Sequence, residues 1–285
     1  MIVVTGANGA FGREVVERLL TRTPAEELVA SVRDPSASPF AARGVAVRLG
    51  NFDRPDTLAA AFEGAETVLI NGTNYGTAPA DRGRQRAAAI GAALGAGVRR
   101  IVVASMFDLG NRPPPFAADY PETEKLVAAS AAEWTILRLT YGMAASLARD
   151  VLAAERAGEL TAPAGEAHAA PAAAADLAEA TAAVLAEPGH AARTYELSGP
   201  DAIDWNDLAA LASERAGRPI VYRPVFGDEF AAKVAADGWP PAAVAALLDY
   251  YAAFRAGWAN KPTPDLAALL GRRPTSSLNA VRAAL

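Results

Sequence analysis

Short hydrophobic runs alternate with helical patterns along the first half of the chain. The run "MIVVT" at residues 1–5 has the composition of a buried strand, and the segment 10–22 places Val15 and Leu19 on one helical face. Strands that alternate with helices need crossover connections, so the sheet is expected to be parallel and covered on both faces. Further strands are predicted at 28–33, 45–50, 67–71, 99–105 and 134–139, and further helices at 56–64, 79–96 and 121–130.

Beyond residue 142 the pattern becomes mostly helical, with a break in the Pro/Gly/Ala-rich stretch 161–174. Runs at 194–200 and 220–225 have the pattern of isolated strands that flank a helix. The predicted fold class is therefore α/β, a Rossmann-type parallel sheet with helices on both faces and a smaller, mostly helical C-terminal lobe. We expect residues 1–141 to form the dinucleotide-binding domain and 142–285 mainly the substrate-binding lobe, with some segments returning to the Rossmann sheet.

Composition narrows the classes of function. The 285 residues are 52% hydrophobic and 21% charged, which suits an ordinary globular core, and the absence of cysteine excludes thiolate catalysis and disulfides. A net charge of −5 argues against nucleic acid as a partner, and the longest apolar run is too short to span a bilayer. No signal peptide is evident, so we expect a soluble, cytoplasmic protein without a membrane partner.

Two clusters of polar residues carry less information. His168 and His190 are 22 residues apart with no acids at ligand spacing, so no metal site is expected. Arg82, Arg84 and Arg86 form a basic cluster at a predicted helix start. A solvated helix face is favoured over phosphate binding for these arginines.

The segment "TGANGAFG" lies directly between the first predicted strand and the first helix. Such a site needs one glycine for the tight turn, a second for close approach of the backbone to a pyrophosphate, and a third for helix–strand packing. The helix N-terminus then faces the anion. This position in a βαβ unit makes the motif a strong indication of dinucleotide binding. The residues expected to hold the pyrophosphate are Gly6, Asn8, Gly9, Ala10, Phe11 and Gly12.

The end of the second strand indicates which dinucleotide is bound. An acidic residue there takes the ribose 2′-hydroxyl of NAD, whereas an arginine accommodates the 2′-phosphate of NADP. Arg33 comes first and Asp34 follows, so NADP(H) is favoured over NAD(H), and Asp34 leaves NAD open. No flavin or metal is expected. The loops after the third and fourth strands are candidates for adenine and ribose contacts, or plain loops: Asn51, Phe52, Asn71, Gly72 and Thr73.

Six segments in a fixed order resemble a known family: "TGANGAFG", "VRDP", "GNFDRPDTL", "AGVRRIVVAS", "ETEKLVAASAAEWTILR" and "TYELSGP". They cover essentially the whole chain and are similar to the atypical short-chain dehydrogenase/reductase family, NmrA-like branch. Within that branch the chain most resembles the NADPH:quinone oxidoreductases of the second type. It departs from them at Asn51, where an acid is usual, and at "LTYG" after Arg138. These departures bear on the substrate more than on the cofactor.

The segment "YPETEK" departs from the catalytic pair of the wider superfamily, in which three residues separate a tyrosine from a lysine. Four residues separate Tyr120 from Lys125, which turns the two side chains roughly 140° apart on a helix. Pro121 is expected to begin the helix and leave Tyr120 in the preceding turn. Ser105 stands where the superfamily has its serine, but a complete proton relay is not predicted.

Loss of the relay favours one kind of acceptor. Hydride transfer to a ketone builds an alkoxide that needs a placed proton donor, whereas a reduced quinone delocalises its charge. The chain is therefore predicted to be an NADPH-dependent reductase of a quinone or a similar conjugated small molecule. The expected catalytic residues are Ser105, Lys125 and Tyr141, which with Gly142 also contact the cofactor, while Phe107 and Tyr141 line the acceptor pocket.

Further alternatives stay open. Tyr141 could border the nicotinamide or serve only in packing. The resemblance implies that Lys125 lies near the nicotinamide ribose, but it could equally be a solvated lysine paired with Glu122. The aromatic residues between Trp239 and Trp258 could close the acceptor pocket or form ordinary lobe core. The chain could also be an NADP(H)-sensing regulatory protein that binds a protein partner without turnover. A conventional carbonyl reductase is disfavoured by the spacing of Tyr120 and Lys125.

Overall fold

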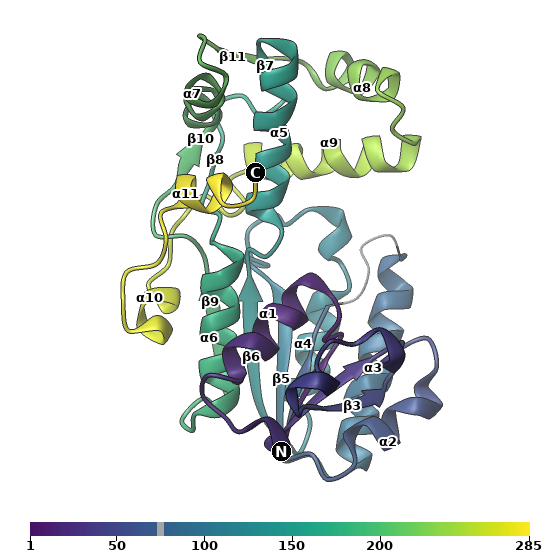
Figure 1. Cartoon of the computed structure of the whole chain (residues 1–285). Coiled ribbons are helices and arrows are strands. Elements are labelled where there is room, and N and C mark those ends of the chain that lie inside the picture. Colours follow the sequence, from purple (N-terminus) through teal and green to yellow (C-terminus); the bar gives the residue numbers. More distant parts are fainter. Residues whose placement is uncertain (73–76) are drawn as a thin grey trace.

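The computed structural model describes residues 1–72 and 77–285, and within them seven parallel strands form one sheet in the order β3-β2-β1-β4-β5-β6-β9 (Figure 1). The predicted α/β fold is confirmed. The chain reverses its direction of travel across the sheet between β1 and β4, which is where doubly wound sheets bind ligands. The strands are β1 Ile2–Thr5, β2 Leu28–Val32, β3 Ala46–Leu49, β4 Thr67–Ile70, β5 Arg100–Met106, β6 Glu133–Leu139 and β9 Arg193–Leu197.

Strand β9 corrects one expectation, because the run at 194–200 is not an isolated strand. It pairs in parallel with β6, with Leu137 opposite Tyr195 and Leu139 opposite Leu197. Within the strand, Tyr195 and Leu197 are buried while Thr194 is exposed and Glu196 is half-buried, which is the alternation of a strand packed on one face. The strand covers the edge of β6, which would otherwise expose unpaired backbone groups.

Helices cover both faces of the sheet. On one face α1 packs against α6 over a core that includes Val4, Leu69 and Leu137, while α2, α3 and α4 cover the other face over Val3, Val68 and Ile101. The bounds are α1 Ala10–Leu19, α2 Leu58–Phe62, α3 Pro79–Gly95, α4 Tyr120–Ala128, α6 Ala174–Ala186 and α10 Asp265–Leu270, with short 3-10 turns at Ala25–Glu27, Pro35–Ala37, Ala41–Arg43, Pro55–Thr57 and Pro115–Ala117.

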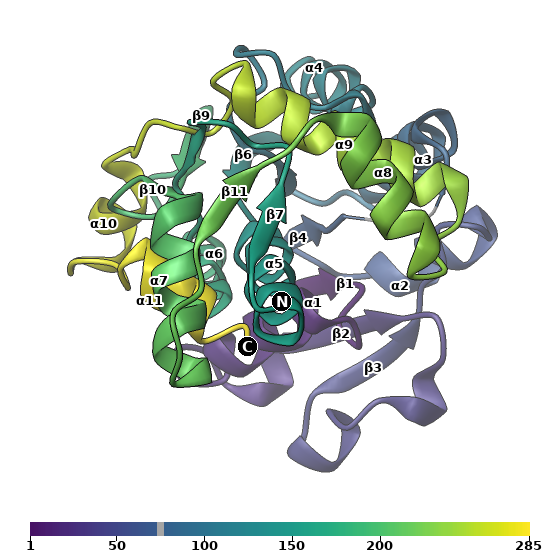
Figure 2. The same ribbon diagram turned by 90° about the horizontal axis from the view of Figure 1, so that it is seen from above.

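The C-terminal lobe lies over the edge at which the strands end (Figures 1 and 2). In it β7 pairs with β11 in parallel, and β8 pairs with β10 in antiparallel fashion. Tyr251, Phe254 and Trp258 are buried in the lobe core, whereas Trp239 is 36% exposed. The lobe elements are α5 Met143–Ala157, β7 Leu160–Ala162, β8 His168–Ala169, β10 Ile203–Asp204, α7 Trp205–Ala216, β11 Tyr222–Pro224, α8 Gly227–Ala236, α9 Pro241–Arg255 and α11 Ser277–Arg282.

In the described ranges, no helix combines the length and the apolar character that crossing a bilayer requires.

Candidate cofactor and redox site

The turn between β1 and α1 has the geometry of a phosphate loop. Gly6 has a φ of +62°, a conformation that favours glycine, and its carbonyl oxygen accepts a hydrogen bond of 2.9 Å from the Gly9 amide. Gly12 packs so closely on the turn that an added Cβ would lie 2.9 Å from the Gly6 carbonyl carbon. Gly9 begins α1 without a side-chain cap, and no acid stands in the first turn. This helix N-terminus is therefore suited to an anion.

Tyr141 lies beside this loop although it is distant in the sequence. Its ring centroid is 4.6 Å from that of Phe11, at an interplanar angle of 49°. Burial, with a smaller contribution from Glu14, raises the pKa of Tyr141 above its usual value, so the hydroxyl keeps its proton at neutral pH. Gly142 follows with a φ of +84° and begins α5. The structure thus brings three predicted site residues together at the ends of β1 and β6.

The two candidates for ribose recognition differ in what they already bind. The carboxylate of Asp34 accepts hydrogen bonds from the Ser36 amide at 3.0 Å and the Ser36 hydroxyl at 2.6 Å, and these lower its pKa. Asn8 donates a 3.4 Å hydrogen bond to the Asp34 carbonyl, which ties the two loops together. Arg33 has an exposed side chain at the end of β2. The acidic group is thus engaged within its own turn, and the guanidinium is accessible.

The loops after β3 and β4 also reach this edge of the sheet. The Asn51 side chain accepts a 2.9 Å hydrogen bond from the Asp53 amide, and Phe52 packs partly against the core under α2 and α3. Asn71 accepts a 2.7 Å hydrogen bond from the Gly72 amide. The side-chain nitrogen of Asn71 lies near Gly6, 3.8 Å from where a Cβ on Gly6 would stand. Thr73 lies outside the described residues.

A buried ion pair that sequence reasoning missed lies under Ser105. The Ser105 hydroxyl donates a 2.5 Å hydrogen bond to Glu124, whose carboxylate is held by Arg138 through two bonds of 2.9 and 2.7 Å. Lys125, next on the helix, is 73% exposed at its side chain and pairs with Glu122 at 2.7 Å. The solvated pairing that the sequence left open is therefore the one observed. The spacing in "YPETE" contained the missed signal, since Glu124 stands four residues after Tyr120.

The start of α4 corrects two expectations. The helix begins at Tyr120 with Pro121 in its first turn, because Asp119 already has helical backbone angles. The Tyr120 ring is buried, with the Arg86 guanidinium 4.2 Å from its centroid. Arg82 and Arg86 were expected on a solvated face, but both are buried and bind Asp119. A carboxylate from a neighbouring helix thus draws these two arginines inward.

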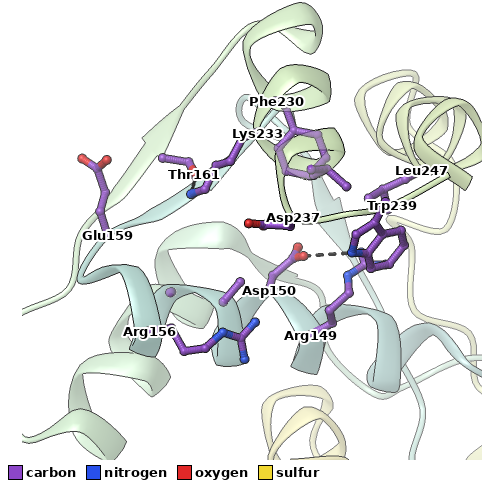
Figure 3. Close-up of a pocket in the computed structure, with 13 residues that line it drawn as sticks. Arg149, Asp150, Arg156, Glu159, Thr161, Phe230, Lys233, Asp237, Trp239 and Leu247 are labelled. Atoms are coloured by element: carbon purple, nitrogen blue, oxygen red, sulfur yellow. Dashed lines mark hydrogen bonds and ion pairs between the residues drawn. The ribbon is translucent and has the colours of Figure 1, made fainter. Parts of the chain in front are cut away.

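Phe107 and the lobe aromatics Tyr251, Phe254 and Trp258 form core, whereas Trp239 is exposed. Phe107 is 2% exposed, and its carbonyl accepts a 2.9 Å hydrogen bond from the Trp258 indole. A pocket of about 80 Å³ opens elsewhere in the lobe, between α5, β7 and α8 (Figure 3). It contains Asp150, which Tyr251 binds at 2.7 Å and whose pKa burial raises. Trp239 lines it, but none of the residues predicted to be catalytic or to bind the cofactor does.

Among the residues that the structure describes, no three His, Cys, Asp or Glu side chains gather closely enough to hold an ion. His168 is exposed in β8, and His190 hydrogen-bonds through Nδ1 to the Tyr195 hydroxyl at 2.8 Å. Burial lowers the pKa of His190, which therefore stays neutral at physiological pH.

The chain is similar to known proteins that bind NAD(P)H. Residues 6–188 match the NAD(P)H-binding family. The chain is 33% identical to quinone oxidoreductase 2 of Escherichia coli over 98% of this chain and 96% of the relative. It is 31% identical to an NAD(P)H azoreductase of Xenophilus azovorans over 88% and 86%. The crystal structure of the NADPH-dependent quinone oxidoreductase from E. coli complexed with NADPH superimposes with a TM-score of 0.92 at 31% identity, covering 99% of each chain.

Proposed function

The chain belongs to the NAD(P)H-binding family, and from this membership we propose that it is a reductase that uses NADPH to reduce a quinone or a similar conjugated acceptor. The similarity to a quinone oxidoreductase and an azoreductase supports this class of acceptor. The observation that carries the proposal is the pair of differently engaged residues after β2, Arg33 and Asp34.

The choice of NADPH rests on charge at the ribose position. One carboxylate oxygen of Asp34 is engaged by the Ser36 amide and hydroxyl within its own turn, which leaves Asp34 with less capacity to bind a ribose 2′-hydroxyl. An accessible guanidinium can form charge-assisted hydrogen bonds to a 2′-phosphate. Arg33 is thus the residue proposed to select NADPH, and the phosphate loop from Gly6 to Gly12 would hold the pyrophosphate.

The choice of acceptor rests on the groups near Ser105. When bound, the reduced nicotinamide supplies a hydride. An alkoxide product would need a proton donor, but Ser105 directs its hydroxyl to Glu124 and Lys125 is turned to Glu122, so Tyr141 alone of the three predicted catalytic groups keeps a proton to donate. The anion of a reduced quinone spreads its charge over the ring and can take its proton from water. Such an acceptor needs chiefly a surface that orients it against the nicotinamide, which Tyr141 and Gly142 would supply.

Lys125 keeps a proposed role at the nicotinamide ribose. Its ammonium must leave Glu122 to reach the site, and an exposed pair of this kind is worth little free energy. Lys125→Ala is expected to weaken NADPH binding if the lysine makes this exchange. Unchanged binding and turnover in this variant would remove Lys125 from the site.

The test is oxidation of NADPH with and without a simple benzoquinone, repeated with NADH. In Arg33→Ala we expect the Kd for NADPH to rise about 10- to 100-fold, because one charge-assisted hydrogen bond or more is lost, and the Kd for NADH to stay constant. Arg99→Ala is the matched control, since Arg99 is exposed and pairs with Glu66 at the opposite end of the sheet.

The outcomes separate the two parts of the proposal. An equal loss of affinity for NADPH and for NADH in Arg33→Ala would contradict the role of Arg33, but it would not contradict the proposed reductase activity. Binding of NADPH without turnover on any quinone would contradict the reductase. It would favour an NADP(H)-sensing protein that acts through a partner.

A further inference from the structure

A chain of polar contacts, buried at Ser105 and part-buried further along, runs from Ser105 into the C-terminal lobe. Glu124 accepts from Ser105 and binds Arg138 through two hydrogen bonds, and both members of this ion pair are largely buried. Arg138 also binds Glu196 at 2.7 Å. Because Ser105, Arg138 and Glu196 lie on the neighbouring strands β5, β6 and β9, the sheet itself holds the chain in register.

The far end of this chain reaches the loop after β5. The second carboxylate oxygen of Glu196 accepts a 2.9 Å hydrogen bond from the Asp108 amide. Asp108 has a φ of +55°, an uncommon conformation for a residue with a side chain, and its carboxylate accepts a 3.0 Å hydrogen bond from the Ala259 amide in the lobe. The contacts thus fix the loop that follows Ser105 and connect it to the lobe.

The direction of the first hydrogen bond follows from the chemistry of its partners. A carboxylate that binds an arginine through both oxygens is ionised and can only accept hydrogen bonds. Ser105 has one hydroxyl proton, and the distance of 2.5 Å is that of a hydroxyl donating to a charged oxygen. The Ser105 proton is therefore directed inward, and only oxygen lone pairs remain for a ligand.

We propose that Glu124 is a positioning residue that holds Ser105 as a hydrogen-bond acceptor toward the redox site. This inference rests on the proposed function and deepens it. An acceptor suits the N–H groups of a nicotinamide carboxamide, and it cannot stabilise a developing alkoxide as a donor would. The Glu124–Arg138 pair thereby selects hydride-accepting substrates whose reduced product is a delocalised anion, and it disfavours simple ketones and aldehydes.

The test is a double-mutant cycle between Ser105→Ala and Glu124→Gln. We expect each single variant to lower kcat on benzoquinone about tenfold and to weaken NADPH binding about fivefold, and the double variant to lose nothing further, because Glu124 acts through Ser105. Glu133→Gln is the control, since Glu133 is exposed at the opposite end of β6. Glu124→Asp keeps the charge and serves if Glu124→Gln does not fold.

Binding and turnover are read separately, so the inference can be judged even without turnover. If the wild type binds NADPH but reduces no quinone, the proposed function fails, and the cycle is measured on NADPH affinity and the emission of bound NADPH. The positioning role would be overturned if Glu124→Gln lowered kcat and NADPH affinity by the same factor in the wild type and in the Ser105→Ala variant. A Glu124→Gln protein with a lower Tm but wild-type kcat would also overturn it, because that result marks a purely structural ion pair.

Discussion

Replacement of Gly12 by alanine should damage the phosphate loop more than any surface change of equal size. An added Cβ would lie 3.0 Å from the Ala7 Cα and 2.9 Å from the Gly6 carbonyl carbon, and closer still to the Gly6 oxygen. These are backbone atoms of the turn, so no side-chain rotation can relieve the contact. The helix must move away from the strand, or the turn must open.

The magnitude follows from two opposing effects. Alanine in place of glycine inside a helix gains about 1 kcal/mol, whereas overpacking of this kind costs about 1–3 kcal/mol. With rigid neighbours we take the upper value, which leaves a net loss of about 2 kcal/mol. Gly91→Ala in α3 is the matched control, because an added Cβ there meets nothing within 4 Å. It should stabilise the protein by about 0.5–1 kcal/mol.

Urea unfolding of both variants measures these changes, and titration with NADPH measures the loop. We expect Gly12→Ala to weaken NADPH binding about tenfold, because the first amides of α1 would no longer meet the pyrophosphate as a set. Gly91→Ala should bind NADPH as the wild type does. If Gly12→Ala were as stable as the wild type and kept its NADPH affinity, close helix–strand packing would not be what the loop requires.

Two buried carboxylates give further predictions. Asp119→Asn leaves Arg82 and Arg86 buried without their shared anion, so urea unfolding should show a loss of about 3–5 kcal/mol, whereas Asp81→Asn at an exposed pair should change stability by less than about 0.5 kcal/mol. Burial raises the pKa of Asp150 above its usual 3.8, so its stabilising contribution is present below that pH and is lost as the pH rises through the folded value. Unfolding measured from about pH 4 to about pH 8 should therefore show the wild type losing stability relative to Asp150→Asn, and a constant difference would refute this assignment.

The sequence predicted the features that depend on local pattern. Strand–helix alternation indicated the sheet, and three glycines at one turn indicated the phosphate loop, because both signals lie within a few neighbouring residues. It missed features whose partners are distant. Arg82 and Arg86 had the pattern of a surface helix, and their partner Asp119 is 37 and 33 residues away. The residues of strand β9 predict a strand but not its partner, because pairing with β6 depends on how distant parts of the chain pack together.

The spacing in "YPETEK" is better understood from Glu124 than from Lys125. A lysine four residues after a tyrosine would stabilise a tyrosinate on the same helix face, and a carboxylate there would oppose one. The chain has Glu124 at that place, and Arg138 on β6 supplies the neutralising charge. The helix therefore still presents an ionised group to Ser105, but one of opposite sign. Under the proposed function, Ser105 and Glu124 would orient a ligand without donating a proton to it, which suits a delocalised acceptor better than a simple ketone.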